Sequence, residues 1–527
     1  MAVPELASFA ASSSPQLPGA QDYLLLSDVH LGSDLVQHIR PWASEQWLRQ
    51  TPAIDAPLIA LLDHYRTRPS ERPLTLVLAG DFLDLVGVCI GSDGAPLKTP
   101  LSREEQAHGL GSAADHVVRK LEAIAERHQG VFCALARFVE AGHQLVVVRG
   151  NHDIELHWHA ARAAFVRAVV QHASEASRPQ LAKRIQICPW FFHVPGLLYV
   201  EHGHEFDPTC SYGDPLLPTC PRDPLRIRAS AFSVLLRQVA RPTRGLSSVS
   251  YGYTGMGAYA GLLYKLGVRG SAGIATRYGR AALSLLREGL PVADVGKRRL
   301  RRAQAALRRF ARVHGISAER LNDLRELYAR PTTQSPIDVM RLLYLDRMLA
   351  GAAALGCAVA AGVSAGPMAA AYGTTAAFFS AYAGIGLGSN QAPHDSLRQG
   401  ARYIADLFDA RWYVMGHTHA PVSEALEPRK TYVNLGSWGE DDPPDERGAT
   451  HVALRSFLLV ECEGAEPSAS FLRWTDHAGP IAFSPAPVAP AAGPAPTLDV
   501  AGLLHSARVA FATLVERLRG ARAASAS

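Results

Sequence analysis

The stretch LTLVLAGDFLD, residues 74–84, joins an apolar run to a glycine and two aspartates, and it indicates the fold. An apolar run of this length that ends in Gly80 and Asp81 is typical of a buried strand followed by a loop. Four other motifs along the chain also follow a short apolar run. The five motifs are Asp28-Val29-His30, Gly80-Asp81, Gly150-Asn151-His152-Asp153, His202-Gly203-His204 and Gly416-His417-Thr418-His419. Sheets present functional groups in loops at strand ends, so we expect these loops to form one site.

The residue types in these motifs suit divalent metal ions. Carboxylate and amide oxygens bind hard cations and imidazole suits Mn, Fe and Zn, so a mixture of Asp, Asn and His favours a transition-metal pair. Two ions roughly 3.5 to 4 Å apart bind a phosphoryl group and generate hydroxide near neutral pH. They need one bridging carboxylate, which we expect to be Asp81. Taken alone, each motif is more often a turn or a helix cap, and only the combination argues for a metal site.

The order of the motifs resembles that of the calcineurin-like metallophosphoesterase family, with its signatures D-x-H, G-D-x-x-D, G-N-H-D, H-G-H and G-H-x-H. The resemblance implies an α/β fold, a four-layer α/β/β/α sandwich of two mixed sheets. It implies a first metal held by Asp28, His30, Asp81 and His419, and a second held by Asp81, Asn151, His202 and His417. It also implies that His152 is the general acid that protonates the leaving oxygen and that Asp153 orients its ring.

Four further residues near the motifs have other expected roles. We expect Asp84 to orient its loop rather than to bind metal. His204 is expected to support the site or the fold, because only one histidine of an H-G-H triplet is normally a ligand. The same holds for His157 and His159, which lie at the start of an apparent helix.

The resemblance implies hydrolysis of a phosphate ester or pyrophosphate by a metal-bridging hydroxide, with Mn as the expected metal and Fe, Zn or Mg as alternatives. The core also resembles the bacterial UDP-2,3-diacylglucosamine pyrophosphatases, including the run Asn434-Leu435-Gly436-Ser437-Trp438, which favours a lipid-linked substrate. His152 departs from that subfamily, which typically has Arg there. A second hypothesis is a soluble phosphomonoesterase or phosphodiesterase acting on a nucleotide or small phosphoester. A third is a non-catalytic scaffold with a metal site.

At 527 residues, 48% of them hydrophobic, the chain has material for more than one domain. The expected parts are a disordered segment 1–20, a first core part 21–220, a mainly helical insertion 221–390, a second core part 391–475, a Pro/Ala-rich linker 476–497 and an amphipathic helix 498–527. Seven cysteines without a C-x-x-C spacing favour a reducing compartment. No secretory signal is evident, so we expect a cytoplasmic protein.

Within the insertion, residues 297–312 (KRRLRRAQAALRRFAR) predict a basic amphipathic helix, because Leu300, Ala303, Leu307 and Phe310 recur at helical spacing. Such a helix can lie on an anionic membrane, and it can equally be a solvated helix face. We expect no nucleic-acid partner, since no aromatic residues interleave with the basic ones and the formal net charge of +5 is modest.

A second candidate for membrane contact is the stretch 348–393, which contains no Asp, Glu, Lys, Arg or His before its end at Pro393. Roughly 20 residues span a bilayer core, so the stretch is long enough for a helical hairpin that returns to the same side. The flanking arginines fit a cytoplasmic catalytic domain. The stretch is also rich in Ala and Gly, which suits tight packing inside a soluble helical bundle. Both interpretations stay open at this point.

Overall fold

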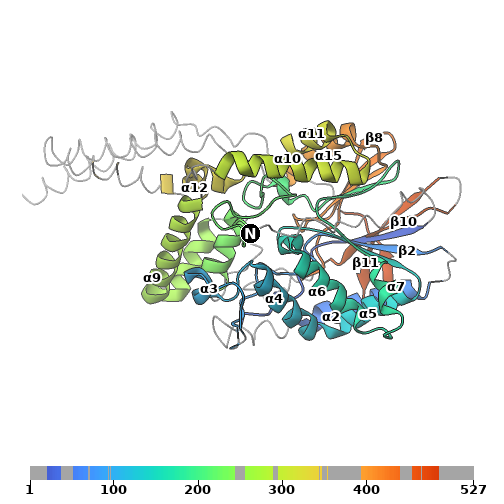
Figure 1. Cartoon of the computed structure of the whole chain (residues 1–527), viewed down its shortest axis with the longest axis horizontal. Coiled ribbons are helices and arrows are strands. Elements are labelled where there is room, and N and C mark those ends of the chain that lie inside the picture. Colours follow the sequence, from blue (N-terminus) through green and yellow to red (C-terminus); the bar gives the residue numbers. More distant parts are fainter. Residues whose placement is uncertain are drawn as a thin grey trace, which may run out of the picture. The chain divides into compact units, whose positions relative to one another are not determined.

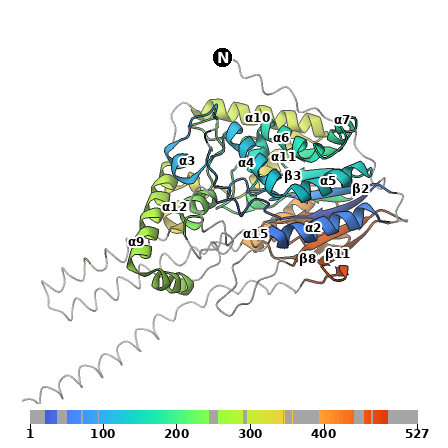
Figure 2. The same ribbon diagram turned by 90° about the horizontal axis from the view of Figure 1, so that it is seen from below.

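The computed structural model describes residues 21–36, 51–68, 72–92, 94, 96–243, 256–288, 295–343, 345–346, 353, 356, 393–439, 454–463 and 466–485. It shows a mixed α/β fold with two mixed sheets and surrounding helices (Figures 1 and 2). The chain divides into one compact unit, Met1–Leu343 with Gln391–Ala486, and a second, Tyr344–Asn390 with Pro487–Ser527. Nearly all of the second unit lies outside the described residues, so the fold below is that of the first.

The larger sheet has seven strands in the order β12-β11-β10-β1-β2-β3-β4. Their bounds are β1 Asp22–Leu26, β2 Leu74–Ala79, β3 Gln144–Val148, β4 Ile185–Cys188, β10 Ser456–Glu461, β11 Ser468–Thr475 and β12 Gly479–Ala482. Strands β1 to β4 run parallel, with Leu24 beside Leu76 and Leu76 beside Leu145, whereas β10 to β12 pair antiparallel. Parallel strands are buried on both faces, which explains the near-continuous apolar runs before the first three motifs.

The smaller sheet has five strands in the order β5-β6-β7-β9-β8. Their bounds are β5 Phe192–Val194, β6 Leu198–Val200, β7 Trp412–Met415, β8 Val422–Glu427 and β9 Lys430–Asn434. Strands β6, β7 and β9 are parallel, and the edge strands β5 and β8 pair antiparallel. Because β6 precedes the insertion and β7 follows it, their pairing brings the fourth and fifth motifs to the same edge of one sheet.

The two sheets share a hydrophobic cluster. Leu25 and Val77 reach it from the larger sheet and Val414 reaches it from the smaller one. Leu24, the neighbour of Leu25 in β1, belongs to a different cluster on the other face of the larger sheet. This is the side-chain alternation expected along a strand, and it means that the larger sheet is covered on both faces.

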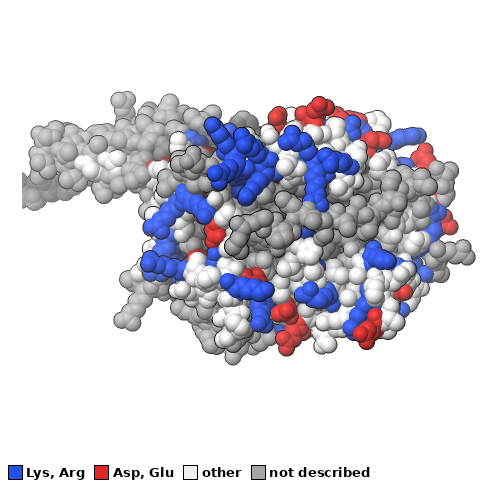
Figure 3. Space-filling model, viewed as in Figure 1, with Lys and Arg blue, Asp and Glu red and all other residues white. Residues whose placement is uncertain are grey.

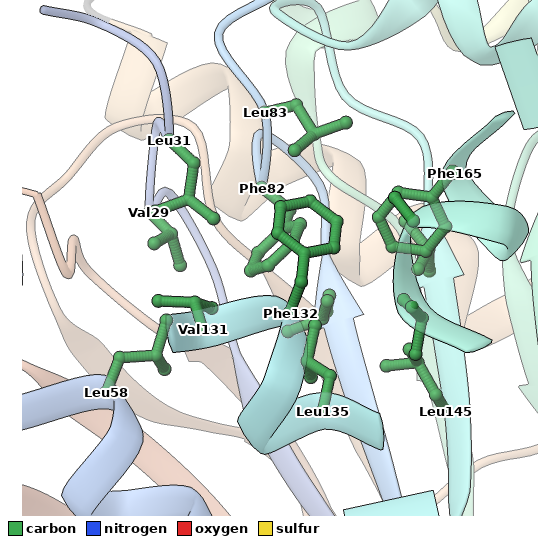
Figure 4. Close-up of a cluster of buried hydrophobic side chains, with 14 of the residues drawn as sticks. Val29, Leu31, Leu58, Phe82, Leu83, Val131, Phe132, Leu135, Leu145 and Phe165 are labelled. Carbon is green, nitrogen blue, oxygen red and sulfur yellow. The ribbon is translucent and has the colours of Figure 1, made fainter. Parts of the chain in front are cut away.

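Helices cover the other face of the larger sheet (Figures 1 and 2). They are α2 Thr51–Arg66, α4 Ala114–Arg127, α5 Gln129–Glu140, α6 His159–Val170 and α7 Arg178–Ala182. Figure 4 shows Phe82, directly after the second motif, packed with Phe132 and Phe165 of these helices. The ring centroids of Phe82 and Phe165 are 6.2 Å apart in an edge-to-face arrangement, a favourable aromatic geometry. The core thus anchors the loop that carries Asp81.

A second group of helices packs on the smaller sheet, namely α10 Val295–His314, α11 Ala318–Glu326 and α15 Pro393–Leu407. The prediction of a helix over 297–312 is confirmed by α10. Its apolar side chains Leu307 and Phe310 are buried in one cluster with Tyr199 and Tyr413 of the smaller sheet. Most of the apolar face of this helix is therefore used inside the protein, and its basic face is turned to solvent.

The described part of the expected insertion, up to Leu343, consists mainly of helices. Besides α10 and α11 it contains α8 Ala231–Leu235, the π-helix η3 Leu236–Ala240, α9 Met256–Glu288, the short η5 Thr332–Gln334 and α12 Pro336–Leu342. The remaining short helices of the core are α3 Arg103–His108, η1 Ile154–His157 and η2 His204–Phe206. Helix α9 contacts η3 through Gln238 and Ser284, whose side chains are hydrogen-bonded.

One expected boundary changes, because β12 lies inside the segment 476–497 that we expected to be a linker. Residues 479–482 pair with β11 after a tight turn, so the larger sheet extends further along the chain than its apolar pattern indicated. Segments 1–20 and 498–527 lie outside the described residues, as does almost all of 348–393. Among the helices that the structure does describe, none has the length and apolarity needed to cross a membrane.

Candidate metal centre

All five motifs lie where a strand ends and a loop begins, as the sequence predicts. The pairs are Asp28 after β1, Asp81 after β2, Asn151 after β3, His202 after β6 and His417 after β7. Strands β1, β2 and β3 are parallel neighbours, and so are β6 and β7. Their carboxyl ends therefore meet at one end of each sheet, which brings the five loops together.

Backbone strain coincides with the expected ligands. Positive φ angles occur at Asp28 (55°), His30 (54°), Asp81 (52°), His417 (71°) and His419 (56°). Among the other non-glycine residues that the structure describes, only Arg429 and Arg455 share this conformation. Such backbone conformations cost about 1–3 kcal/mol each and cluster at functional sites. The fold thus maintains an unfavourable backbone where it presents these five side chains.

The loops also interlock closely. The backbone N–H groups of Val29 and His30 both donate to the carbonyl oxygen of Asp81, at 3.0 and 2.9 Å. A Cβ atom on Gly150 would collide with the Asp81 carboxylate, and one on Gly416 would collide with Asp28. Glycine is therefore required at both positions because the loops approach each other so closely.

One group of ligand atoms is formed by Asp28, His30 and His419. Nε2 of His419 lies 3.1 Å from Oδ1 of Asp28 and 3.2 Å from Nε2 of His30. Oδ1 of Asp28 is buried and accepts no hydrogen bond from a described residue. Two imidazole nitrogens and an unpartnered carboxylate oxygen that converge in this way fit a bound cation.

A second group is formed by Asp28, Asp81 and His202. Nε2 of His202 lies 3.1 Å from Oδ2 of Asp81 and 3.9 Å from Oδ1 of Asp28. Nδ1 of the same ring is 3.0 Å from the carbonyl oxygen of Ala79, to which it donates its proton. This hydrogen bond leaves Nε2 as the nitrogen that faces the two carboxylates, and a metal ion bound there would replace its proton.

The remaining expected ligands, Asn151 and His417, are close to this group. Oδ1 of Asn151 is buried and has no hydrogen-bond partner among the described residues. The ring of His417 lies 5.4 Å from that of His202, and its Nε2 is 3.1 Å from Oδ2 of Asp207. The bond to Asp207 leaves Nδ1 of His417 as the nitrogen available to a metal. Asp207 was not predicted from the sequence, because nothing in the adjacent residues distinguishes it from any other aspartate.

The charges of the group reinforce one another. Burial acts to raise the pKa of Asp28, but His202 and His419 outweigh it and lower this pKa to about 2. Burial likewise acts to lower the pKa of His202, but Asp81 and Asp28 raise it to about 9. Burial lowers the pKa of His30 to about 4, which keeps its imidazole neutral near neutral pH. Near neutral pH the two carboxylates are thus ionised and the proton on His202 balances part of their charge, a place that a metal ion would take when it binds.

The ring of His152 is held by Asp84 and not by Asp153, which corrects the expectation from the sequence. Nδ1 of His152 lies 2.6 Å from Oδ1 of Asp84. Asp153 instead accepts hydrogen bonds from the backbone N–H groups of Gly150, at 2.6 Å, and Phe82, at 3.0 Å. Asp153 therefore ties the second loop to the third. Asp84 orients the expected acid, because its side chain and not that of the sequence neighbour reaches the ring.

Two arginines of the inserted helices reach this part of the core. Arg241, directly after η3, forms an ion pair with Oδ2 of Asp84 and donates to the carbonyl oxygen of Ser33 at 2.9 Å. Arg237 donates to the carbonyl oxygens of Val86 and Gly109, at 3.4 and 3.0 Å. Both side chains are almost fully buried. The insertion thus helps to hold the loop that carries Asp84, which its sequence did not indicate.

His204 lies behind the centre, consistent with the supporting role expected for it. Together with Arg149, Glu201 and Glu205 it lines a small cavity next to His202. Each of these four side chains has at least one buried polar atom without a hydrogen-bond partner among the described residues. Ordered water in the cavity would satisfy such atoms.

His157 and His159, for which we also expected a supporting role, lie at helix ends. His157 ends η1 and His159 begins α6, where it is exposed.

The donor set fits a pair of divalent metal ions. It combines carboxylate oxygens, an amide oxygen and imidazole nitrogens, and three of its buried polar atoms have no hydrogen-bond partner in the described chain. These are the unpartnered atoms of Asp28, Asn151 and His202. In comparisons with known proteins, no family model and no curated protein matches this chain.

Proposed function

We propose that this protein is a dinuclear metal-dependent phosphoesterase that hydrolyses a phosphate ester or a pyrophosphate. The observation that carries the proposal is the convergence of strand-end loops from two sheets on overlapping groups of Asp and His side chains. Helices on the outer faces of both sheets also suit the four-layer α/β/β/α sandwich of the calcineurin-like metallophosphoesterases. The motif order of the sequence and the geometry of the loops support the same assignment independently.

The ligand roles come from the order of the motifs, and the groups Asp28-His30-His419 and Asp28-Asp81-His202 support them. Asp28, His30, Asp81 and His419 would hold one ion, and Asp81, Asn151, His202 and His417 the other. The ions would supply Lewis-acid polarisation of the phosphoryl oxygens and would activate the attacking water. Asp81 belongs to both proposed sets, so its carboxylate would help to hold both ions.

His152 would act as the general acid in this mechanism. Its Nδ1 is tied to Asp84, so Nε2 is the nitrogen that can donate a proton to the leaving oxygen. Burial acts to lower the pKa of His152, but the charges of Asp81 and Asp84 outweigh it and raise this pKa above its usual value. A raised pKa favours the protonated ring, as an acid requires.

The donor types suit several divalent metals, so experiment must identify the one that is bound. A mixture of carboxylate, amide and imidazole ligands suits Mn, and it also accepts Fe, Zn or Mg. For the substrate, lipid-linked phosphates and pyrophosphates are the first class to test, because the basic helix α10 and the uncharged stretch 348–393 both belong to the insertion. Water-soluble nucleotides and small phosphoesters are the second class.

The test compares Asp81→Asn with a matched variant, Asp63→Asn, at a half-exposed aspartate of α2 outside the loops. The full chain is stripped of metal with a chelator, reconstituted with Mn²⁺, and assayed on an aryl phosphate monoester and on an aryl phosphate diester. Asp81→Asn should bind less metal and lose activity by a factor of about 10³ or more, since the bridging carboxylate stabilises both ions. Asp63→Asn should match the unmodified protein. Full activity of folded Asp81→Asn would refute the metal assignment.

A further inference from the structure

The solvent face of α10 carries a dense array of positive charge. The helix contains no Asp or Glu, and the basic side chains that it exposes are Lys297, Arg298, Arg301, Arg302, Arg308 and Arg312. We call these six residues the basic face. Figure 3 shows Lys and Arg side chains gathered over α10, whereas Asp and Glu gather over the neighbouring α11. The charge is thus concentrated on one helix and is not spread evenly over the surface.

The opposite face of α10 is not available to a partner. Leu307 is 5% exposed and Phe310 is 6% exposed, both in the cluster over the smaller sheet. Two apolar side chains of α10 remain accessible near its ends, Leu300 at 54% and Val313 at 40%. A helix that packs its apolar stripe on its own core cannot insert that stripe into a bilayer. Contact with a partner must therefore be made through charge.

The basic face is also not neutralised within the protein. In the part of the chain that the structure describes, none of its six residues forms an ion pair with an Asp or Glu. Arg299, by contrast, turns inward and donates to the carbonyl oxygens of Thr219 and Leu217 at 2.6 and 2.7 Å, which attaches α10 to the loop before α8. The helix is therefore fixed to the protein while its outer charges remain uncompensated.

We propose that the basic face of α10 docks this protein on the surface of an anionic lipid bilayer, without insertion of the helix. The face extends from Lys297 to Arg312, about 22 Å at 1.5 Å per residue, and its charges lie along one side of a straight rod. A bilayer offers a flat layer of phosphate groups to such a rod. A nucleic acid fits less well, because the exposed side of α10 has no aromatic side chain to stack on bases.

The proposal is tested by flotation of the full chain with vesicles of phosphatidylglycerol and phosphatidylcholine in equal parts, and with vesicles of phosphatidylcholine alone. The protein should float with the anionic vesicles at low ionic strength and should be released at about 1 M salt, where the Debye length falls to about 3 Å. It should not float with the neutral vesicles. Because no substrate or metal enters the measurement, the result is independent of the proposed phosphoesterase activity.

Two double variants locate the contact. Each basic group near an anionic surface contributes about fivefold to the partition constant, so Arg301→Gln with Arg308→Gln should weaken binding about 30-fold. The matched control is Arg167→Gln with Lys183→Gln, which removes the same charge from exposed positions in and near the helices on the larger sheet. It should change binding less than about twofold.

Three results would overturn the proposal. The first is equal weakening by both double variants, which would mean that net charge and not the basic face drives binding. The second is flotation that survives both high salt and the α10 substitutions, which would assign the contact to another part of the chain. The third is absence of flotation together with salt-dependent binding of duplex DNA by the unmodified protein and not by the α10 variant, which would make nucleic acid the partner.

Discussion

The ligand loops and the inserted helices contribute to the same centre in different ways. The loops bring carboxylates and imidazoles to the ends of parallel strands, where the sheets fix their positions. The inserted helices reach the same region with the arginines 237 and 241, which hold the loop behind Asp84. The loops therefore carry the proposed ligands, while the insertion supports Asp84, the residue that contacts His152.

This difference predicts which changes abolish chemistry and which only weaken it. A change in a loop removes a ligand or the acid itself. A change in the inserted helices acts through another side chain, so its effect on the rate should be smaller and should follow the role of the residue that it supports.

The largest effect in this comparison is expected for His152→Gln. Loss of a general acid typically lowers the rate about 10²–10⁴-fold, and it does so only when the leaving oxygen needs a proton. An alkyl phosphate should therefore lose most of its turnover, whereas a dinitrophenyl phosphate, whose leaving group departs as an anion, should be cleaved almost normally. The measurement is kcat on both esters with the metal content determined in parallel. An equal loss on both esters would remove His152 from the acid role.

The next largest effects are losses of stability, and we expect a larger loss for Arg241→Met than for Arg237→Met. Arg241→Met leaves the buried carboxylate of Asp84 without its ion-pair partner and should lower the free energy of unfolding by about 3–5 kcal/mol. Arg237→Met removes donors to backbone carbonyls and an ion pair with the partly exposed Glu104, and should cost about 1–3 kcal/mol. Chemical denaturation of both variants measures these changes.

The rate of phosphate-ester hydrolysis should distinguish the two arginine variants more clearly than their stability does. Only Arg241→Met should slow hydrolysis of the alkyl phosphate more than hydrolysis of the dinitrophenyl phosphate. Of the two arginines, only Arg241 contacts Asp84, which orients His152, the proposed acid. Arg241→Lys, which retains a charge beside Asp84, should recover part of the rate. If Arg237→Met produced the same dependence on the leaving group, the insertion would act on the loop as a whole and not through Asp84.

The ligand loops were predictable because the signal is local. In each motif Asp, Asn or His, the residue types that bind metals, closely follow an apolar run, and each of the five motifs lies at a strand end. The partners of these motifs were not predictable, since Asp84, Asp207 and Arg241 reach His152, His417 and Asp84 through space. Asp153 was assigned to the ring of His152 because it is its neighbour in the sequence. The backbone turns that carboxylate toward the second loop instead.

For α10 the sequence predicted the helix but not what its apolar face packs against. The helical period of its apolar residues was clear from the sequence, and the helix formed as predicted. The helical spacing of apolar residues shows that one face of the helix is apolar, but it does not show whether that face packs on protein or on lipid. The cluster over the smaller sheet answers this question for Leu307 and Phe310.

The packing of α10 can be tested with two leucines on the same face of the same helix. Leu307→Ala removes a side chain that is 5% exposed and should lower the free energy of unfolding by about 2–5 kcal/mol. Leu300→Ala, at 54% exposure, should change it by less than about 0.5 kcal/mol. Denaturant unfolding without vesicles measures both values. Equal and small effects would mean that α10 does not pack on the core in solution, and that its apolar face is available to a membrane.

The smallest effect is expected for Asp207→Asn, which tests how the fifth loop is supported. Asp207 accepts a hydrogen bond from Nε2 of His417, and loss of such a partner typically lowers metal affinity about 10–100-fold. The loss should be confined to the site that His417 serves, because His30 and His419 do not contact Asp207. A titration with Mn²⁺ should then show one weakened site and one unchanged site, while Asp223→Asn, at an aspartate in the loop before α8, should leave both unchanged. Equal weakening of both sites would show that Asp207 supports the interlocked loops together, so that the two ion sites could not be tuned separately.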